Sequence, residues 1–285
     1  MVDTAITIIL PVKHYVPSYL KAAIQSVLDQ SSGDWNLLLL ADKSVTAELR
    51  SFLKSELSDS RFQLIAVGTP SLAATINAGM KKASTEFVTL LLGDDIFAAN
   101  AIEALHRAIC AHPHVDFFHS SRRIIDGEGN SISSVHASRS HFEWKDFLHG
   151  SPVKHLLCWR REMALAIGGV DEAFSMQGPD DYDFPWSMFE QGANFQALQE
   201  CLYIYRNHCD GFRLTTHEPR TVQLLTVRRI LRKHGIGFWR SWIVVYGKWR
   251  RGLASQAIYG SRLTRSFYRL VGYDSARSWR QSTYR

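Results

Sequence analysis

The feature that most constrains the fold is a regular alternation of apolar runs and helical patterns across residues 4–120. The apolar runs, typical of buried strands, are TAITIILPV, WNLLLLA, RFQLIAV, EFVTLLL and VDFFHSS. Between them, apolar residues recur at helical spacing, as in Leu20, Ile24 and Val27. Strands alternating with helices predict an α/β fold, with a mostly parallel sheet flanked by helices. Ligands of such sheets bind at the carboxyl ends of the strands.

The pattern changes after Ser120, but no linker or repeat interrupts the chain before residue 219. RRIIDGEGNSISSV predicts a hairpin around residues 127–130, and HLLCWRREMALAIGG predicts a strand followed by a short helix. Residues 1–218 are therefore predicted to form one catalytic domain. Residues 219–285 are predicted to form a separate, largely helical extension.

Carboxylates follow two of the predicted strands. Asp42 stands just past the second strand, and Asp94 and Asp95 stand just past the fourth. Asp42 alone is equally well explained as a turn former or helix cap. The adjacent pair after Gly93 instead favours a divalent cation, because Mg²⁺ and Mn²⁺ prefer carboxylate oxygens and often share their coordination with substrate phosphates.

The stretch GPDDYDF gathers three more carboxylates, Asp180, Asp181 and Asp183, within four residues. A short helix is predicted from Phe184 and is stopped by Gly192, so helix capping explains one or two of these acids. Capping does not explain all three, because like charges this close raise one another's pKa. A catalytic role for at least one carboxylate is the competing hypothesis.

Bulk properties indicate a globular protein that stays inside the cell. The apolar content is 46% and the charged content 21%, which are ordinary values. The four cysteines lack C-x-x-C spacing and are interpreted as reduced thiols. The start, MVDTAITIILPV, is typical of a first strand and lacks the basic region of a signal peptide. A cytoplasmic location is therefore expected.

Four stretches in order resemble the inverting, nucleotide-sugar-dependent glycosyltransferases of family 2, which have the Rossmann-like GT-A fold. The resemblance covers about residues 5–210. ITIILPV with SYLKAAIQSVLDQSSGDWNLLLLADKS matches the first strand, helix and second-strand aspartate. The later pieces are INAGMKKASTEFVTLLLGDDIF, GGVDEAFSMQGPDDYDFPWSMFEQG and LYIYRNH. Any one piece is a weak signal, whereas four at familiar spacing are a strong one.

The resemblance implies a role for each matching position. Asp181 falls on the catalytic base, with Asp180 beside it in place of the usual Glu, and Asp183 supports the loop and helix. Asp94 falls on the metal-binding acid of the D-x-D motif, and His208 matches a position near the metal or diphosphate. The donor-binding positions are Pro11, Asp42, Asn77, Asp94 and Asp95.

The implied function is metal-dependent, inverting transfer of a sugar from a nucleoside diphosphate to a hydroxyl of a glycan or lipid-linked acceptor. Mn²⁺ or Mg²⁺ is the implied cofactor, and surface polysaccharide or glycoconjugate synthesis is the implied setting. Two departures matter: Leu92 replaces the first acid of D-x-D, and Lys13-His14 replaces an aromatic-Asn pair. A catalytically inactive GT-A-fold binding or scaffold protein is therefore the alternative. A sugar nucleotidyltransferase is disfavoured, because no glycine-rich loop follows the first strand.

The extension differs from the body in charge. Residues 220–285 contain 13 Arg and 2 Lys but one acid, Asp274, in a chain whose net charge is +6. GFWRSWIVVYGKWRRG interleaves aromatic with basic residues. This pattern fits a helix packed on the catalytic domain or on a partner. It also fits peripheral attachment to an anionic membrane surface at the inner face of the cell membrane. Nucleic acid is not expected, since no binding motif accompanies the charge.

Overall fold

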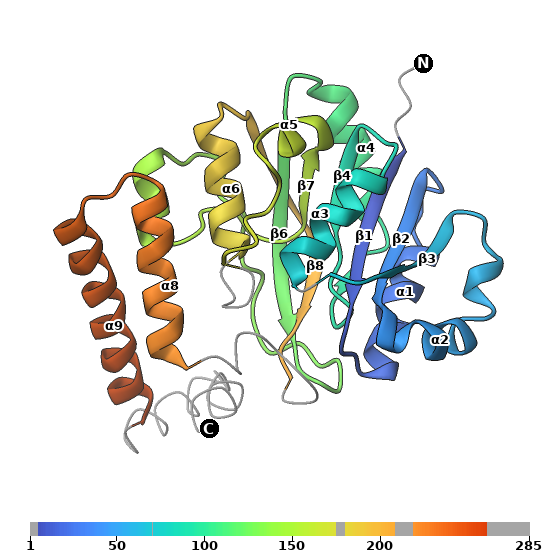
Figure 1. Ribbon diagram of the computed structural model, residues 1–285, viewed down its shortest axis with the longest axis horizontal. Coiled ribbons are helices and arrows are strands. Elements are labelled where there is room, and N and C mark those ends of the chain that lie inside the picture. Colours follow the sequence, from blue (N-terminus) through green and yellow to red (C-terminus); the bar gives the residue numbers. More distant parts are fainter. Residues whose placement is uncertain (1–4, 70, 175–179, 209–218, 261–285) are drawn as a thin grey trace.

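The structure, a computed structural model, describes residues 5–69, 71–174, 180–208 and 219–260. A central sheet carries helices on both faces, and two further helices lie at one end of the molecule (Figure 1). The strands are β1 (Ile6–Val12), β2 (Trp35–Asp42), β3 (Phe62–Val67), β4 (Phe87–Leu90), β5 (Ile96–Phe97), β6 (Phe117–Ile125), β7 (Leu157–Arg160) and β8 (Phe195–Arg206). The α-helices are α1 (Pro17–Leu28), α2 (Lys43–Phe52), α3 (Leu72–Lys82), α4 (Ala101–Ala111), α5 (Arg161–Ala166), α6 (Asp180–Glu190), α8 (Arg220–Lys233) and α9 (Phe238–Gly260), and the 3-10 helices are η1 (Glu56–Ser58) and η2 (Trp144–His149).

The strand order in the described residues is β3-β2-β1-β4-β7-β6-β8-β5. Strands β1 to β4 pair in parallel, and β6 and β8 are parallel to each other. Only β7 and the two-residue β5 run antiparallel to their neighbours in this sheet. The predicted α/β fold with a mostly parallel sheet is confirmed. The hairpin prediction holds as two isolated antiparallel bridges, Ile125–Ser131 and Arg122–His136.

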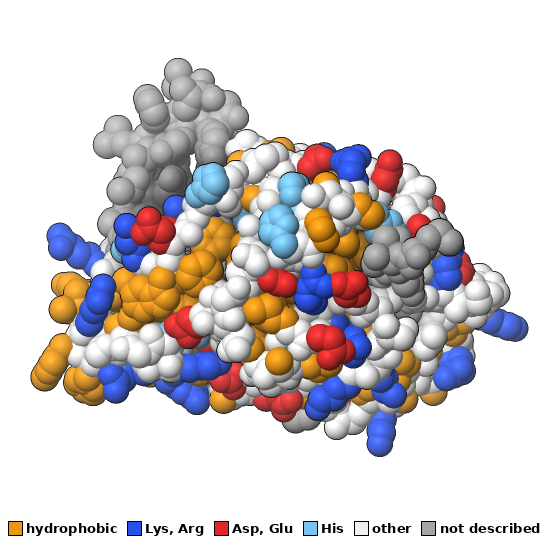
Figure 2. Space-filling view, turned by 90° about the horizontal axis from the view of Figure 1, so that it is seen from above, with side chains coloured by type: hydrophobic (Ala, Val, Ile, Leu, Met, Phe, Trp, Pro, Cys, Tyr) orange, Lys and Arg blue, Asp and Glu red, His pale blue; other side chains and the backbone are white. Residues whose placement is uncertain are grey.

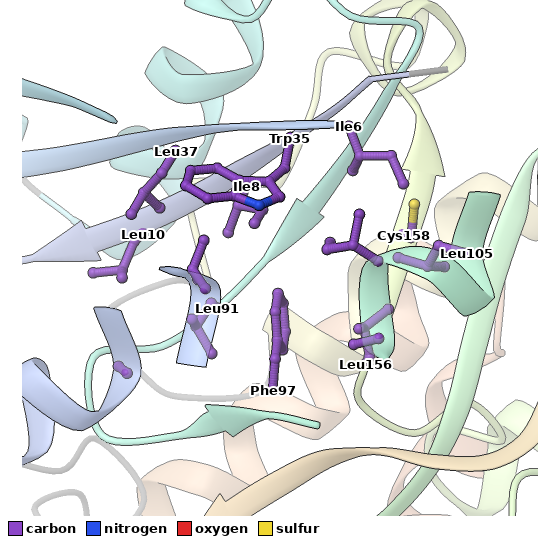
Figure 3. Packing of buried hydrophobic residues seen from close by; sticks show 14 of the residues in the cluster. Ile6, Ile8, Leu10, Trp35, Leu37, Leu91, Phe97, Leu105, Leu156 and Cys158 are labelled. Carbon is purple, nitrogen blue, oxygen red and sulfur yellow. The ribbon is translucent and has the colours of Figure 1, made fainter. Parts of the chain in front are cut away.

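Alternation along the strands divides the core into two layers. Ile6, Ile8 and Leu10 of β1 point to one face, where they pack with residues of α1 and α4 (Figure 3). Ile9 points to the other face, among residues of α3, α5 and α6. Because neighbouring side chains of a strand lie on opposite sides, a strand covered on both faces must be apolar throughout. This explains the uninterrupted apolar runs in the sequence.

Helix α6 begins earlier than the sequence indicated. It starts at Asp180 instead of Phe184, and Pro185 lies inside it. All three aspartates therefore lie in the first turns, where a negative charge complements the helix dipole. The expected stop is present, since Gly192 has φ +86°, in the left-handed region that favours glycine.

The described part of the extension packs on the body. A third apolar cluster joins η2, α6, α8 and α9 through residues that include Phe147, Trp186, Ile230 and Val245. Between α6 and α8, the ring of His234 stacks on Trp186 with centroids 4.1 Å apart. Of the explanations that the sequence left open, packing against the catalytic domain holds for α8.

Asp183 connects these two helices. Its buried carboxylate accepts hydrogen bonds from Lys233 Nζ (2.7 Å) and His234 Nε2 (3.0 Å). Burial acts to lower the pKa of Lys233, but its hydrogen bonds to Asp183 and Asp171 raise it overall. His234 Nδ1 contacts Glu190 Oε2 at 2.8 Å. Asp183 therefore anchors the extension, consistent with the supporting role expected of it.

Asp183→Asn should lower the free energy of unfolding by about 2 kcal/mol, because it weakens two hydrogen bonds to a buried charged group, each of which contributes about 1.5–3 kcal/mol. The matched variant is Asp171→Asn, which removes the more exposed carboxylate from the same lysine and should cost under about 1 kcal/mol. Urea unfolding measures both. Equal losses in the two variants would contradict the anchoring role.

Candidate active site

The topology brings the ends of six strands to one edge of the sheet. Strands β1 to β4, β6 and β8 all run in one direction, so their carboxyl ends lie together. Asp42 ends β2, Asp94 follows β4, and His208 follows β8. The antiparallel β7 begins at this edge, which places Lys154 and His155 there as well.

Asp95 is a buried structural carboxylate with no solvent exposure. It accepts hydrogen bonds from the Tyr203 hydroxyl (2.6 Å) and from the backbone N–H of Arg206 (2.7 Å). Burial, together with the charge of Asp95, raises the pKa of Tyr203 well above its usual value, so this hydroxyl keeps its proton and donates. Asp95 therefore ties the loop after β4 to the end of β8. Its expected part in donor binding stays a prediction.

Asp94 is more open, with 31% of its side chain exposed. Its Oδ2 lies 3.1 Å from His208 Nε2, and the imidazole is buried against the edge of the Tyr19 ring. The Arg206 guanidinium donates to the Asp94 carbonyl oxygen (3.0 Å) and lies 4.5 Å from the Tyr19 ring centroid. The structure thus brings together two residues that the sequence placed 114 positions apart.

This pair fits a divalent metal ion. A carboxylate oxygen and an imidazole nitrogen are both ligands that Mn²⁺ accepts, and phosphate and water can complete the coordination. Within the described ranges no group of three or more His, Cys, Asp or Glu residues is arranged to hold a metal. An ion bound by Asp94 and His208 would therefore depend on the substrate for the rest of its ligands.

The other donor-side predictions have defined surroundings. Asp42 caps α2 by accepting from Ser44 N (2.9 Å) and Ser44 Oγ (2.6 Å), and these bonds lower its pKa. Pro11 lies half-buried in β1, opposite Leu40. Both assignments to donor binding stay predictions.

The amide of Asn77 is occupied by protein. It donates to Val170 O (2.9 Å) and Glu172 Oε1 (3.1 Å), and its oxygen accepts from Val170 N (2.8 Å). Gly169 has φ +80°, and a Cβ there would lie 2.3 Å from the Asn77 oxygen. These contacts favour a role in holding the chain that leads to α6. A direct contact with the donor stays a prediction.

Asp181 lies in the first turn of α6. Solvent reaches its side chain, although protein atoms crowd around the carboxyl. This crowding raises the pKa of Asp181, while the charges of Arg122 and Lys154 act to lower it. Because water still reaches the group, it screens part of both effects. An accessible carboxylate with increased proton affinity can accept a proton from a bound hydroxyl. The side chain of Asp180 lies outside the described residues.

Sequence reasoning missed four residues that shape this edge. Tyr203 and Arg206 belong to the LYIYRNH piece, which marked them only as part of a motif. Arg122 and Lys154 had no recognisable signal, because basic residues at the start of a predicted hairpin or before a predicted strand are common on surfaces. Only the pairing of β6 with β7 and β8 brings them near Asp181.

Comparison with solved structures identifies the fold. Residues 1–349 of S. aureus TarS in complex with UDP-GlcNAc match 80% of this chain and 66% of that chain, with a TM-score of 0.65 and 15% identity. At that identity the likeness establishes the GT-A fold alone.

Sequence comparisons give the family. The model "Glycosyl transferase family 2" matches residues 7–165, and the chain belongs to this family. The O-antigen biosynthesis protein RfbC of Myxococcus xanthus is 26% identical over 207 residues, covering 70% of this chain and 16% of RfbC. The UDP-Glc:alpha-D-GlcNAc-diphosphoundecaprenol beta-1,3-glucosyltransferase WfgD of Escherichia coli is 32% identical over 133 residues, covering 46% of this chain and 50% of WfgD. The chain spans less than two thirds of either relative.

Asp94→Asn should abolish the Mn²⁺-dependent stabilisation of the protein by UDP and leave the melting temperature of the free protein near that of wild type. The neighbouring variant Asp95→Ala should keep the Mn²⁺-dependent shift but lower the melting temperature of the free protein. The reason is that it leaves the Tyr203 hydroxyl buried without its acceptor. A thermal-shift titration of UDP with and without Mn²⁺ separates the two effects. A full Mn²⁺-dependent shift in Asp94→Asn would exclude Asp94 as a ligand.

Proposed function

We propose that this protein is a metal-dependent, inverting glycosyltransferase that moves a sugar from a nucleoside-diphosphate donor to a hydroxyl of a glycan or lipid-linked acceptor. The observation that carries the proposal is the arrangement at the carboxyl edge of the sheet. There, the Asp94–His208 pair and the accessible carboxylate of Asp181 come from separate elements. A family 2 fold with these groups has what transfer requires on each side of the anomeric carbon.

On the donor side, Asp94 and His208 would hold a divalent ion close to where the diphosphate of the nucleotide sugar binds. When bound, that ion supplies Lewis-acid stabilisation of the negative charge that grows on the leaving diphosphate. Asp42, at the end of β2, and Pro11, one residue before the end of β1, are assigned to the nucleoside. The complex of TarS with UDP-GlcNAc supports a nucleotide sugar as the class of donor.

On the acceptor side, Asp181 acts as the general base. The attacking hydroxyl loses its proton to the carboxylate while its oxygen forms the new bond to the anomeric carbon, and the bond to the diphosphate breaks. A base within hydrogen-bond reach of the hydroxyl contributes roughly 10²–10⁴-fold to the rate. Attack from the face opposite the leaving group inverts the anomeric configuration. Asp180 precedes the base in α6 and helps to position it.

The names of two relatives support a setting in surface polysaccharide synthesis. RfbC is an O-antigen biosynthesis protein, and WfgD is named for transfer to a lipid diphosphate acceptor. Synthesis of a surface polysaccharide or glycoconjugate on a lipid-linked acceptor, at the cytoplasmic face of the membrane, is consistent with both.

Helix α9 supports attachment to that membrane surface. Its buried side, with Ser241 and Val245, packs on the body. The rest of its surface exposes large apolar residues, namely Phe238 (50%), Trp239 (78%), Trp242 (40%), Ile243 (70%), Tyr246 (59%) and Trp249 (41%). Hydrophobic and basic side chains gather at this end of the molecule (Figure 2). None of the helices in the described ranges has the length and apolarity to span a bilayer.

The charge of α8 and α9 favours contact with anionic lipid. Residues 220–250 contain six Arg, two Lys and no acid. Arg228 packs over the rings of Phe238 and Trp242, which places positive charge beside the exposed aromatic residues. Each basic residue near an anionic surface contributes about 1 kcal/mol, and aromatic rings suit the headgroup region.

Asp181→Asn should lower turnover by about 10²-fold or more, because the shape is kept and the proton acceptor is lost. Mn²⁺-dependent UDP binding should survive, since it depends on Asp94 and His208. In the wild type, kcat/KM for the acceptor should fall as the pH drops through the pKa of Asp181, which the crowding protein atoms place above that of an ordinary aspartate. The assay is sugar transfer at a series of pH values, with a panel of nucleotide sugars.

Wild-type turnover in Asp181→Asn would show that another group is the base. The alternative of an inactive binding protein makes a different prediction. It would bind a nucleotide sugar yet release no nucleoside diphosphate with any donor in the panel.

The double variant Trp239→Ser, Ile243→Ser should bind phosphatidylserine liposomes at least tenfold more weakly than wild type, because two apolar side chains no longer enter the membrane interface. Val135→Ser is the matched control, since Val135 is 54% exposed and lies outside α9. Liposome pelleting at increasing salt measures both the affinity and its electrostatic part. Equal pelleting of all three proteins would rule out this face as the membrane contact.

A further inference from the structure

Two cations at the carboxyl edge of the sheet, Arg122 and Lys154, have no part in the mechanism above. Arg122 comes from the second half of β6, and Lys154 directly precedes His155 at the start of the segment that leads into β7. The charges of both act on the Asp181 carboxyl. They therefore lie at the carboxyl edge of the sheet, near the proposed base.

Arg122 is held by neutral groups. Its Nη1 lies 3.3 Å from Nδ1 of His155, and its guanidinium carbon lies 5.2 Å from the centroid of the Tyr205 ring. Burial lowers the pKa of His155 to about 3, with Arg122 and Lys154 adding to the effect, so the ring is neutral. Its Nδ1 accepts from Arg122, because a guanidinium can only donate. The buried Nε of Arg122 has no hydrogen-bond partner among the described residues.

Lys154 is also left without a close counter-charge. It is half-buried, and within the described ranges no carboxylate oxygen lies within 4.0 Å of its ammonium group. Burial lowers the pKa of Lys154, Arg122 lowers it further, and Asp181 opposes them. Lys233, in contrast, sits between Asp171 and Asp183.

Holding two cations in a partly dehydrated place is unfavourable unless an anion accompanies them. The charge of Arg122 also disfavours the charged form of Lys154. Asp181 offers one negative charge, and as the base it gives that charge up when it takes the proton. A second anion from a substrate would complete the balance.

We propose that Arg122 and Lys154 form a binding site for a phosphate group of a substrate, beside the base. The guanidinium can donate two parallel hydrogen bonds to phosphate oxygens, and the ammonium adds a point charge. This proposal rests on the proposed function for the role of Asp181 as the base. Its ligand chemistry is a diphosphate, which can come from a lipid diphosphate acceptor or from the donor nucleotide.

The test measures binding without turnover, by isothermal titration calorimetry on the full chain. Inorganic pyrophosphate without metal probes the site itself. UDP with Mn²⁺ probes the donor, and geranyl diphosphate without metal stands in for a lipid diphosphate. In Arg122→Gln and in Lys154→Gln, the affinity for pyrophosphate should fall about tenfold or more, as expected for loss of a charge-assisted hydrogen bond.

Two neighbours provide matched controls. Arg123 follows Arg122 on β6 and is exposed on the opposite side of the strand, and Lys145 is an exposed lysine paired with Glu143. Arg123→Gln and Lys145→Gln should keep wild-type affinity. Arg122→Lys preserves the charge and should recover part of the loss. If Arg122→Gln fails to fold, Lys154→Gln carries the test.

The two sources give different patterns. A loss confined to geranyl diphosphate, with UDP·Mn²⁺ unchanged, assigns the site to the acceptor, whereas a loss for UDP·Mn²⁺ assigns it to the donor. Unchanged pyrophosphate affinity in both variants, or an equal change in the controls, overturns the site. Asp181→Asn separates this proposal from the proposed function. It removes a competing negative charge, so pyrophosphate should bind a few-fold more tightly whether or not Asp181 is the base.

Discussion

The candidate site depends on one buried carboxylate. Asp95 accepts hydrogen bonds from the Tyr203 hydroxyl and the Arg206 backbone, and so fixes the end of β8 against the loop after β4. Arg206 in turn donates to the Asp94 carbonyl oxygen. These bonds set the distance between Asp94 and His208. A buried acid that is fully hydrogen-bonded holds its neighbours rigidly, whereas an unpaired one would destabilise the domain.

The sequence predicts the parts of the fold that depend on local pattern. Buried parallel strands must be apolar throughout, so β1, β2 and β4 can be predicted from their apolar runs. The edge where Asp42 and Asp94 lie follows from where these runs end. The predicted start of α6 was wrong by four residues, because Pro185 is compatible with the first turn of a helix as well as with the later position that it occupies. Strand β5 is too short to produce a pattern. The contacts of Asn77, and the approach of Arg122 and Lys154 to Asp181, arise from pairing between distant segments that no local signal records.

The extension shows why composition alone could not choose between packing and membrane contact. Its basic residues are compatible with packing on the body and with contact to an anionic membrane. Lys233 and His234 turn inward to Asp183, in the anchor between α8 and α6, whereas the aromatic residues of α9 turn outward. A single amphipathic pattern is compatible with either burial or an interface. Only the helix packing separates the inward-facing residues from those left for another surface.

Opposing effects act on Asp181, and their balance bears on how an acid can serve as a base here. Protein atoms around the carboxyl favour its protonated form, and Arg122 and Lys154 favour its charged form. Burial without the cations would keep the group protonated over a wider range of pH, and the cations without burial would make it a weaker proton acceptor. A phosphate bound by the two cations would cancel part of their charge and so strengthen the base when the site is filled. The position of Asp181 in the first turn of α6 adds the helix dipole to the effects that favour the carboxylate. If Asp181 is the base, as proposed, its proton affinity would respond to the charge of a substrate bound beside it.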